Sequence, residues 1–158
     1  MSRELIESWT DYGAAVERLL GLVKHRLQIY DEDLKALKLD SLEHLATLSS
    51  LLARPGDHPL RIVLRETSHF QAHTPRLQQF FTTWEHRVEV RQTPNALAHL
   101  RDNMLLVDGM HALVRLEKNL PRSVLIIDEP NDIAPYAKRF DEIWQESNKN
   151  LLEKPLGL

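Results

Sequence analysis

The most informative part of this chain is the nine-residue stretch Arg101-Asp102-Asn103-Met104-Leu105-Leu106-Val107-Asp108-Gly109. Its centre is a run of four apolar residues, which is typical of a strand buried on both faces. An Asp-Gly pair, a common turn signal, ends the run. Arg101 and Asn103 come at its start, and residues two apart in a strand point to the same face. The stretch therefore predicts a buried strand with polar groups at both ends.

The segments around it alternate between strand and helical periodicity. Strand patterns cover residues 26–30, 60–64, 87–91, 103–107, 112–116 and 124–127, and helical patterns start at Asp11, Asp40, Thr74 and Pro130. Alternating strands and helices predict a parallel sheet, and three closely spaced strands predict antiparallel additions to it. We therefore expect an α/β fold in which a mixed, mainly parallel sheet lies between helices.

Local signals predict where two of the helices begin. Asp40 and Glu43 have the spacing of a capping box, and Thr74 before Pro75 is typical of an N-cap followed by a first helical turn. The helix after Thr74 is expected to bury one apolar stripe, formed by Leu77, Phe80, Phe81 and Trp84.

Potential metal ligands occur in two predicted loops. His69 and His73 are four apart but come just before the helix that begins at Pro75, so we expect them in a loop without metal. The acidic run 31–33 follows a strand and is interpreted as a solvated loop rather than a cation site. Glu66 and Arg91 also come at strand ends, and the carboxyl edge of such a sheet is the usual binding side.

Composition limits the class of protein. The 158 residues suit one domain with its own core. The formal net charge is −3 and the basic residues are scattered, so a dedicated nucleic-acid surface is not expected. The chain has no Cys, no apolar run near the ~20 residues of a membrane helix, and a start unlike a secretory signal. We expect a cytoplasmic bacterial protein with no membrane contact, cofactor or metal.

The chain resembles one repeat of the phospholipase D superfamily. The signature of that family is His-x-Lys-x-x-x-x-Asp, usually followed by Gly, and Asp108 and Gly109 stand at the last two positions. Further strands and a closing helix follow in the order of the family. That helix carries the family's Phe-x-x-x-Trp pattern at Phe140 and Trp144. The resemblance implies a phospholipase D-like single repeat with an extra N-terminal helix.

The resemblance divides the chain into three parts. Residues 1–25 form an N-terminal helical extension, residues 26–148 the phospholipase D-like domain, and residues 149–158 a C-terminal tail expected to dock on the body or a partner. The chain is similar, more closely, to an uncharacterised domain at the carboxyl end of some bacterial GNAT acetyltransferases. That similarity rests on Ile29-Tyr30-Asp31, Leu105-Leu106-Val107-Asp108-Gly109, Arg115, and residues 140–144.

The two changed signature positions argue against the family's reaction. In active members the His attacks phosphorus, a second His protonates the leaving group, and the Lys neutralises phosphate oxygens. Arg101 stands in place of the His, and its guanidinium keeps its proton and delocalises its lone pairs, so it is no nucleophile. Asn103 stands in place of the Lys and brings no charge to phosphate.

The remaining site is interpreted as vestigial and ligand-binding, formed by Arg101, Asn103, Asp108 and Arg115. Arg101 and Asn103 share a strand face and, with Arg115 from the next strand, are expected to form a small anion-binding surface. The alternative is a solvated sheet end. Asp108 either pairs with Arg101 or caps the turn at Gly109.

A second alignment of the signature places its His at His99. The Asp would then come nine residues after the His rather than seven, which moves the carboxylate ~6–7 Å along the strand. We therefore prefer the alignment with Arg101, Asn103 and Asp108.

Three functional hypotheses follow. The first is a non-catalytic phospholipase D-like module for binding, assembly or regulation, with a possible homodimer because active phospholipase D sites use two repeats. The second is a divergent phosphodiesterase or nuclease that acts through His99 or His111. The third is a sensor of a phosphate-containing or other anionic ligand, which Arg101 would bind.

Overall fold

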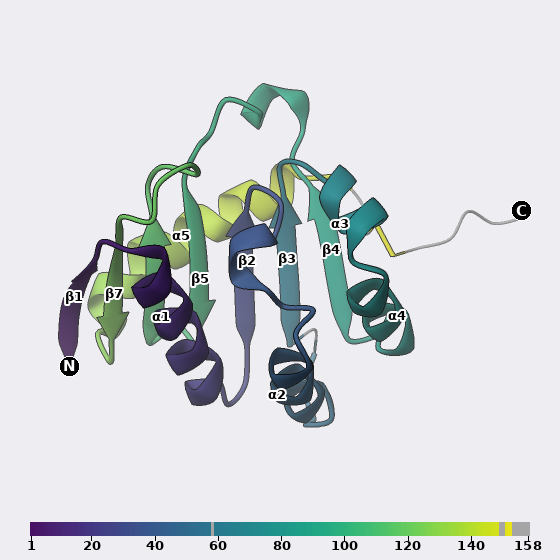
Figure 1. Cartoon of the computed structure of the whole chain (residues 1–158), viewed down its shortest axis with the longest axis horizontal. Helices are drawn as coiled ribbons and strands as arrows, with labels where there is room; N and C mark the ends of the chain where they lie inside the picture. The colour runs from purple at the N-terminus through teal and green to yellow at the C-terminus, as the bar shows by residue number, and fades with distance from the viewer. Residues whose placement is uncertain (58, 149–150, 153–158) are drawn as a thin grey trace, which may run out of the picture.

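The computed structural model describes residues 1–57, 59–148 and 151–152 and contains one seven-stranded sheet (Figure 1). The strands are β1 (Ser2–Ile6), β2 (Leu27–Asp31), β3 (Leu60–Leu64), β4 (Val88–Gln92), β5 (Asn103–Val107), β6 (His111–Arg115) and β7 (Ser123–Ile127). The α-helices are α1 (Trp9–Leu22), α2 (Leu42–Leu52), α3 (Ser68–His73), α4 (Pro75–Thr83) and α5 (Pro130–Glu146). Short 3-10 turns are η1 (Lys35–Leu37) and η2 (Asn95–Leu97).

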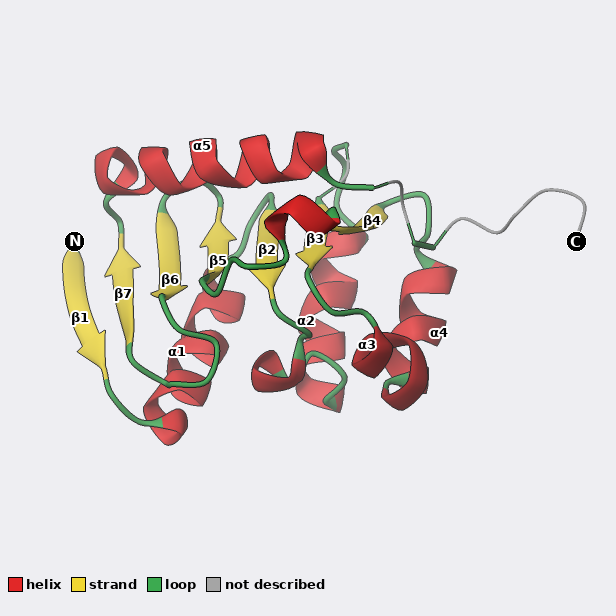
Figure 2. Cartoon of the chain, turned by 90° about the horizontal axis from the view of Figure 1, so that it is seen from above, coloured by secondary structure: helices red, strands yellow, loops and turns green. Residues whose placement is uncertain are grey.

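Helices cover both faces of the sheet (Figure 2). Helix α5 lies alone on one face, where Phe140 and Ile143 pack against Val63 and Leu106. Helices α1 to α4 lie on the other face, and the larger core is there. Because both faces are covered, β2 and β5 are buried along their whole length, as the continuous apolar run at residues 104–107 predicts.

The sheet order is β1-β7-β6-β5-β2-β3-β4. The predicted mixed α/β fold is confirmed, but the expected excess of parallel pairing is wrong. Among the strands of the described residues, only β2 with β3 and β3 with β4 pair in parallel. The other four pairings are antiparallel, because the three closely spaced strands form a meander and β5 then pairs with β2.

The first residues add a strand that the sequence did not predict. Strand β1 pairs antiparallel with β7 at the edge of the sheet, and of its five residues only Ile6 is buried. A mostly exposed edge strand has no apolar alternation to reveal it. Residues 1–25 therefore contribute a strand as well as a helix.

Helix α1 begins two residues before the predicted Asp11. The hydroxyl of Ser8 accepts a hydrogen bond from the backbone N–H of Asp11, which makes Ser8 the N-cap. The apolar stripe of this helix, including Leu19 and Leu20, is buried in the chain's own core. It is therefore not left free for a partner.

Three local predictions on the α2 to α4 side are corrected. The N-cap of α2 is Ser41, whose hydroxyl accepts from the His44 N–H, and not Asp40. The Thr74 hydroxyl donates to the carbonyl of Phe70 and so does not cap α4, although α4 does begin at Pro75. The expected loop around His69 is helix α3. In the expected stripe, Leu77 and Phe81 are buried and Phe80 and Trp84 are half-buried.

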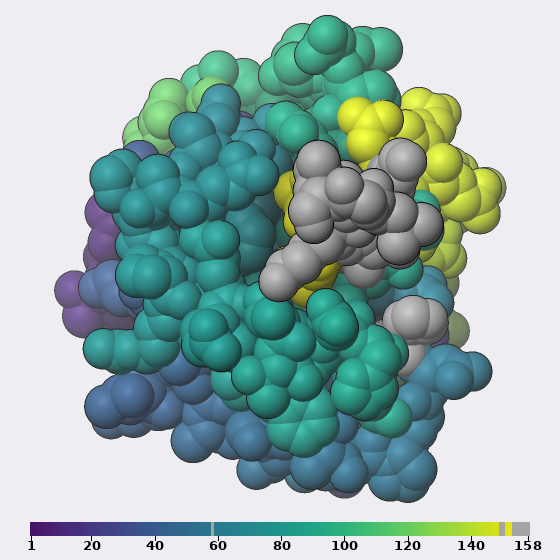
Figure 3. All heavy atoms as spheres, turned by 90° about the vertical axis from the view of Figure 1, so that its right-hand side faces the viewer, coloured from purple at the N-terminus to yellow at the C-terminus, as the bar shows by residue number. Residues whose placement is uncertain are grey.

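The β4 edge meets the end of helix α5 (Figure 3). Arg91 donates to the carbonyl of Trp144, and the Leu151 N–H donates to the carbonyl of Val90 at 2.6 Å. Leu151 and Leu152 pack on the core, and the rest of the predicted tail at 149–158 lies outside the described residues. None of the helices in the described ranges is long and apolar enough to span a bilayer.

Candidate functional site

Four strand ends meet on one edge of the sheet and carry most of its buried polar groups. Asn103 at the start of β5 is the register partner of Arg115 at the end of β6, so the structure brings these two predicted site residues together. Asp31 ends the neighbouring strand β2, and Arg65 follows β3 directly. This edge, with the charged loops that follow the strands, is the candidate site.

Asn103 is an internal link at this edge. It is 2% exposed, and its amide oxygen accepts from the Glu32 N–H at 2.8 Å and from Nη2 of Arg65 at 3.0 Å. Both lone pairs of that oxygen are therefore used. The amide holds the loop after β2 and the residue after β3 in place, and it presents little to solvent.

Arg65 and Glu32 form the centre of a charged network. Nε of Arg65 lies 2.8 Å from one carboxylate oxygen of Glu32, and Nζ of Lys118 lies 3.0 Å from the other. The Arg65 side chain is 2% exposed, and its guanidinium stacks on the Tyr30 ring at 4.8 Å. Burial opposes ionisation of Glu32, but the hydrogen bonds from Arg65 and Lys118 outweigh it and lower the Glu32 pKa.

Arg101 is paired with Glu117. Nε of Arg101 donates to both carboxylate oxygens at 2.9 and 2.7 Å, and Nη2 donates to one of them as well. Both side chains are partly exposed, and the bond from Arg101 lowers the Glu117 pKa. The predicted pair of Arg101 with Asp108 is therefore wrong, because strand β5 separates them and places them at opposite edges of the sheet.

Asp108 has a structural role at that opposite edge. Its backbone is left-handed with φ 56°, a conformation that Asp tolerates well. Its carboxylate accepts from the N–H groups of Lys24, His25 and Arg26 at 2.9, 2.9 and 2.8 Å. Asp108 thus caps the loop between α1 and β2 rather than the turn at Gly109, and the structure does not bring it near the other predicted site residues.

Arg115 forms a buried ion pair with Asp31. Nη2 of Arg115 lies 3.5 Å from Oδ1 of Asp31, and the guanidinium lies over the rings of Trp9 and Tyr12 at 5.2 and 5.0 Å. Oδ2 of Asp31 accepts from the Leu34 N–H at 2.7 Å. Burial raises the Asp31 pKa, and Arg115 offsets part of that rise. The expectation of a solvated acidic loop is therefore wrong for Asp31.

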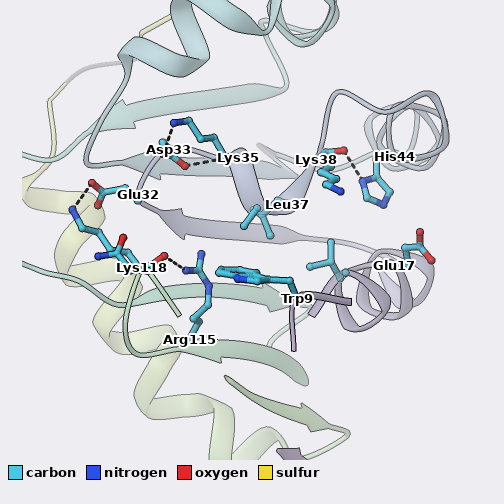
Figure 4. A pocket seen from close by; sticks show the side chains of 14 residues that line it. Trp9, Glu17, Glu32, Asp33, Lys35, Leu37, Lys38, His44, Arg115 and Lys118 are labelled. Carbon is cyan, nitrogen blue, oxygen red and sulfur yellow. Dashed lines mark hydrogen bonds and ion pairs between the residues drawn. The ribbon is translucent and has the colours of Figure 1, made fainter. Parts of the chain in front are cut away.

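A cavity of about 720 Å³ opens beside this pair (Figure 4). Helix α1 lines it with Trp9, Gly13 and Val16. The segment after β2 lines the opposite side, including Leu37 of η1, and Arg115 lines it from the end of β6. Of the four predicted site residues, only Arg115 lines this cavity.

The histidines of the alternative hypothesis are far apart. His99 is exposed in the loop before β5. His111 begins β6 at the opposite edge, where its Nδ1 accepts from the Asp128 N–H at 2.9 Å. No group of three His, Cys, Asp or Glu side chains that could hold a metal ion occurs among the described residues.

Sequence reasoning missed the partners that complete the edge. These are Glu32, Arg65, Glu117 and Lys118, and also Arg139 of α5, which binds the Asp102 carboxylate at 3.0 and 2.9 Å. Their shared signal was position, because Glu32 and Arg65 come directly after β2 and β3 and Glu117 and Lys118 soon after β6. Position does not reveal which cation meets which anion.

Comparisons with solved structures support the fold. The archaeal chromatin protein TrmBL2, described as having a novel mode of DNA binding, matches at TM-score 0.68 and 14% identity over 94% of this chain, which spans only 55% of that protein. The phospholipase D family member Nuc from Salmonella typhimurium matches at TM-score 0.62 and 14% identity, over 94% of this chain and 97% of Nuc. NucT from Helicobacter pylori matches at TM-score 0.62 and 10% identity, over 94% and 98%.

These likenesses confirm the predicted phospholipase D-like fold. The similarity to a domain appended to acetyltransferases stays a prediction. None of the curated proteins matches the chain in sequence. A family model matches residues 9–152, so the chain belongs to the family described as domain of unknown function DUF7931.

Proposed function

We propose that this chain is a non-catalytic phospholipase D-like module that serves binding, assembly or regulation. The observation that carries the proposal is the state of the signature edge. Arg101 is held by Glu117, and the Asn103 amide oxygen is occupied by Arg65 and the Glu32 N–H. The edge is thus a set of internal ion pairs and hydrogen bonds.

Phosphoryl transfer through a covalent intermediate needs a nucleophile with a free lone pair and cations for the phosphate oxygens. At the two signature positions, Arg101 supplies no such lone pair and Asn103 no charge. Nearby cations are also engaged, since Arg65 and Lys118 both bind Glu32. A phosphate would have to displace these carboxylates to reach them.

The alternative, a divergent phosphodiesterase or nuclease, would rely on His99 or His111. A mechanism that uses two histidines needs both within reach of one phosphate. His99 precedes β5 and His111 starts β6 at the other edge of the sheet, so one chain does not supply such a pair. The His111 ring nitrogen that bonds to Asp128 is also occupied.

A homodimer through the same edge remains part of the proposal. Its contact would involve the exposed Arg101 and Glu117 rather than Asn103, which is buried, or Asp108, which lies at the opposite edge. Sedimentation of the wild-type chain at micromolar concentrations tests this assembly role, and a monomer throughout would remove it.

Catalysis is tested with bis-p-nitrophenyl phosphate and with single- and double-stranded nucleic acid. We expect wild type, His99→Ala and His111→Ala to show only the background rate, with His86→Ala, an exposed histidine before β4, as the matched control. Turnover by wild type that is lost in the His99 or His111 variant but kept in the control would overturn the proposal in favour of the enzyme.

A further inference from the structure

We propose that the cavity between α1 and η1 binds a small organic carboxylate with an apolar body. This deepens the proposed function by naming the class of ligand, and it moves the binding site from Arg101 and Asn103 to the cavity that Arg115 lines. The argument rests on the charge, the apolar surface and the shape of that cavity.

The charge comes from the orientation of the buried pair. Arg115 lines the cavity, whereas Asp31 lies behind it and is turned toward the N–H groups of Asp33 and Leu34. The positive end of the pair therefore faces the cavity, in surroundings where water screens little. Nε of Arg115 is also buried without a hydrogen-bond partner in the part of the chain that the structure describes.

The other charged side chains of the cavity favour a single negative charge. Lys118 is bound to Glu32 at 3.0 Å, and Lys35 lies 3.8 Å from Asp33. Of the remaining lining charges, Lys38 is cationic and Glu17 is anionic, and both are exposed. The Glu17 carboxylate on the same cavity disfavours a dianion such as a phosphate ester.

Phosphate sites in proteins use several convergent N–H groups from a glycine-rich loop or a helix N-terminus. Gly13 is the one glycine among the lining residues, and it lies within helix α1 rather than in a loop. The cavity instead offers one buried guanidinium beside apolar walls, which suits a carboxylate.

Apolar side chains supply the rest of the surface. The Trp9 indole is 47% exposed at the cavity, and Val16 and Leu37 lie deeper (Figure 4). A large exposed aromatic ring beside a cavity gives a flat face against which an apolar body can stack. The volume of about 720 Å³ lies within the range of sites for small organic ligands.

The wall formed by η1 is held in an unusual backbone conformation. Leu34 and Lys38, on either side of η1, are both left-handed, with φ 73° and 50°. Such residues cost about 1–3 kcal/mol each and persist where surrounding contacts hold them. Here the Asp31 carboxylate holds the Leu34 N–H, and His44 Nδ1 bonds to the Lys38 carbonyl at 2.8 Å. The same buried pair thus positions both the charge and the wall.

The test uses four probes on the full chain by isothermal titration calorimetry. Indole-3-acetate and octanoate are the carboxylates, indole-3-acetamide is the neutral match of the first, and inorganic phosphate is the anion without an apolar body. We expect at least one carboxylate to bind with a dissociation constant of about 1 mM or tighter. The amide and phosphate should bind at least about ten times more weakly.

Two glycines of the same helix provide matched variants. A Cβ at Gly13 meets nothing within 4 Å, so Gly13→Leu adds a side chain into the cavity without a clash. Gly21 has the same free space but does not line the cavity, so Gly21→Leu is the control. Both changes favour the helix by up to about 1 kcal/mol, so both variants should fold.

We expect Gly13→Leu to weaken carboxylate binding at least about tenfold and Gly21→Leu and Arg101→Ala to leave it unchanged. Equal binding by Gly13→Leu and Gly21→Leu, or tighter binding of the amide or phosphate than of the carboxylates, would overturn the inference. So would a wild type that binds neither carboxylate. Turnover of a phosphodiester in the same samples would overturn the proposed function whatever the binding result, so the two failures are distinguishable.

Discussion

The Asp31 carboxylate and the Arg115 guanidinium lie 3.5 Å apart inside the protein, with 2% and 3% of their side chains exposed. They join the ends of β2 and β6, which are separated in the sheet by β5. Asp31 also holds the Leu34 N–H, and Arg115 Nη1 donates to the Lys118 carbonyl at 2.6 Å. One ion pair thus connects the sheet edge to both loops that flank the cavity.

Replacement of Arg115 by Met should lower the free energy of unfolding by about 3–5 kcal/mol, because the Asp31 carboxylate then stays buried without its partner. The double variant Asp31→Asn with Arg115→Met should recover at least half of that loss. Urea denaturation at neutral pH measures both. Equal stability of the single and double variants would contradict this account of the pair.

The same single variant should lose less stability at lower pH. A carboxyl whose folded pKa is raised takes up its proton in the folded state first, so stability rises as the pH falls through that folded pKa. Burial already raises the Asp31 pKa in the wild type, and loss of Arg115 removes the influence that lowers it. The deficit of Arg115→Met relative to wild type should therefore shrink from pH 7 toward pH 5. A constant deficit would show that Asp31 does not titrate in this window.

Replacement of Asp108 by Ala should cost about 3 kcal/mol, because three backbone N–H groups lose a charged acceptor. Asp128→Ala is the matched control. Asp128 has the same φ of 56°, but no hydrogen bond of its side chain occurs in the described part of the chain. The control should cost about 1 kcal/mol, the price of a left-handed Ala. Equal losses in thermal unfolding would show that backbone conformation alone explains Asp108.

Glu32→Gln should destabilise the chain by about 2 kcal/mol at pH 7, because Arg65 and Lys118 both lose their anionic partner. The folded Glu32 pKa is lowered, so its stabilisation is present above the unfolded value of about 4.3 and is lost as the pH falls through the folded pKa. The difference between wild type and variant should therefore decrease below about pH 4. Denaturant midpoints measured from pH 7 to pH 3 test this, and a difference that grows in acid would contradict it.

Tyr12 should resist ionisation at alkaline pH. Burial and the nearby Asp31 raise its pKa from 10.0 to about 12, so the unfolded chain loses this proton first. Stability should fall by about 2 kcal/mol between pH 10 and pH 12 from this group. Tyr12→Phe should lack that component. The phenolate absorbance of the two proteins, followed with pH, gives the pKa directly, and ionisation of Tyr12 near pH 10 would contradict its burial against Arg115.

Much of the fold follows from local sequence patterns. The buried strands β3 and β5 were predicted with the bounds that the structure has, because continuous apolar runs between turn signals mark strands covered on both faces. Helices with a strong apolar stripe, such as α5, were predicted for the same reason. Strand β1 was missed because its exposed edge position requires no pattern.

The site was predicted in part. Asn103 and Arg115 do meet, since residues at the start of one strand and the end of its hairpin partner are forced together by antiparallel pairing. Arg101 with Asp108 does not, because a five-residue strand holds its two ends apart. The position of Glu117 two residues after β6 was the local sign that Arg101 had a nearer partner.

By itself the sequence determined the elements, the mixed sheet and the absence of the signature His and Lys, because side-chain periodicity and residue identity are local properties. Only the tertiary structure decided that four of the six strand pairings are antiparallel, that Asp31 is buried with Arg115, and that a cavity opens beside them. Those features depend on which strand ends become neighbours and on how burial and charge balance between residues distant in the chain.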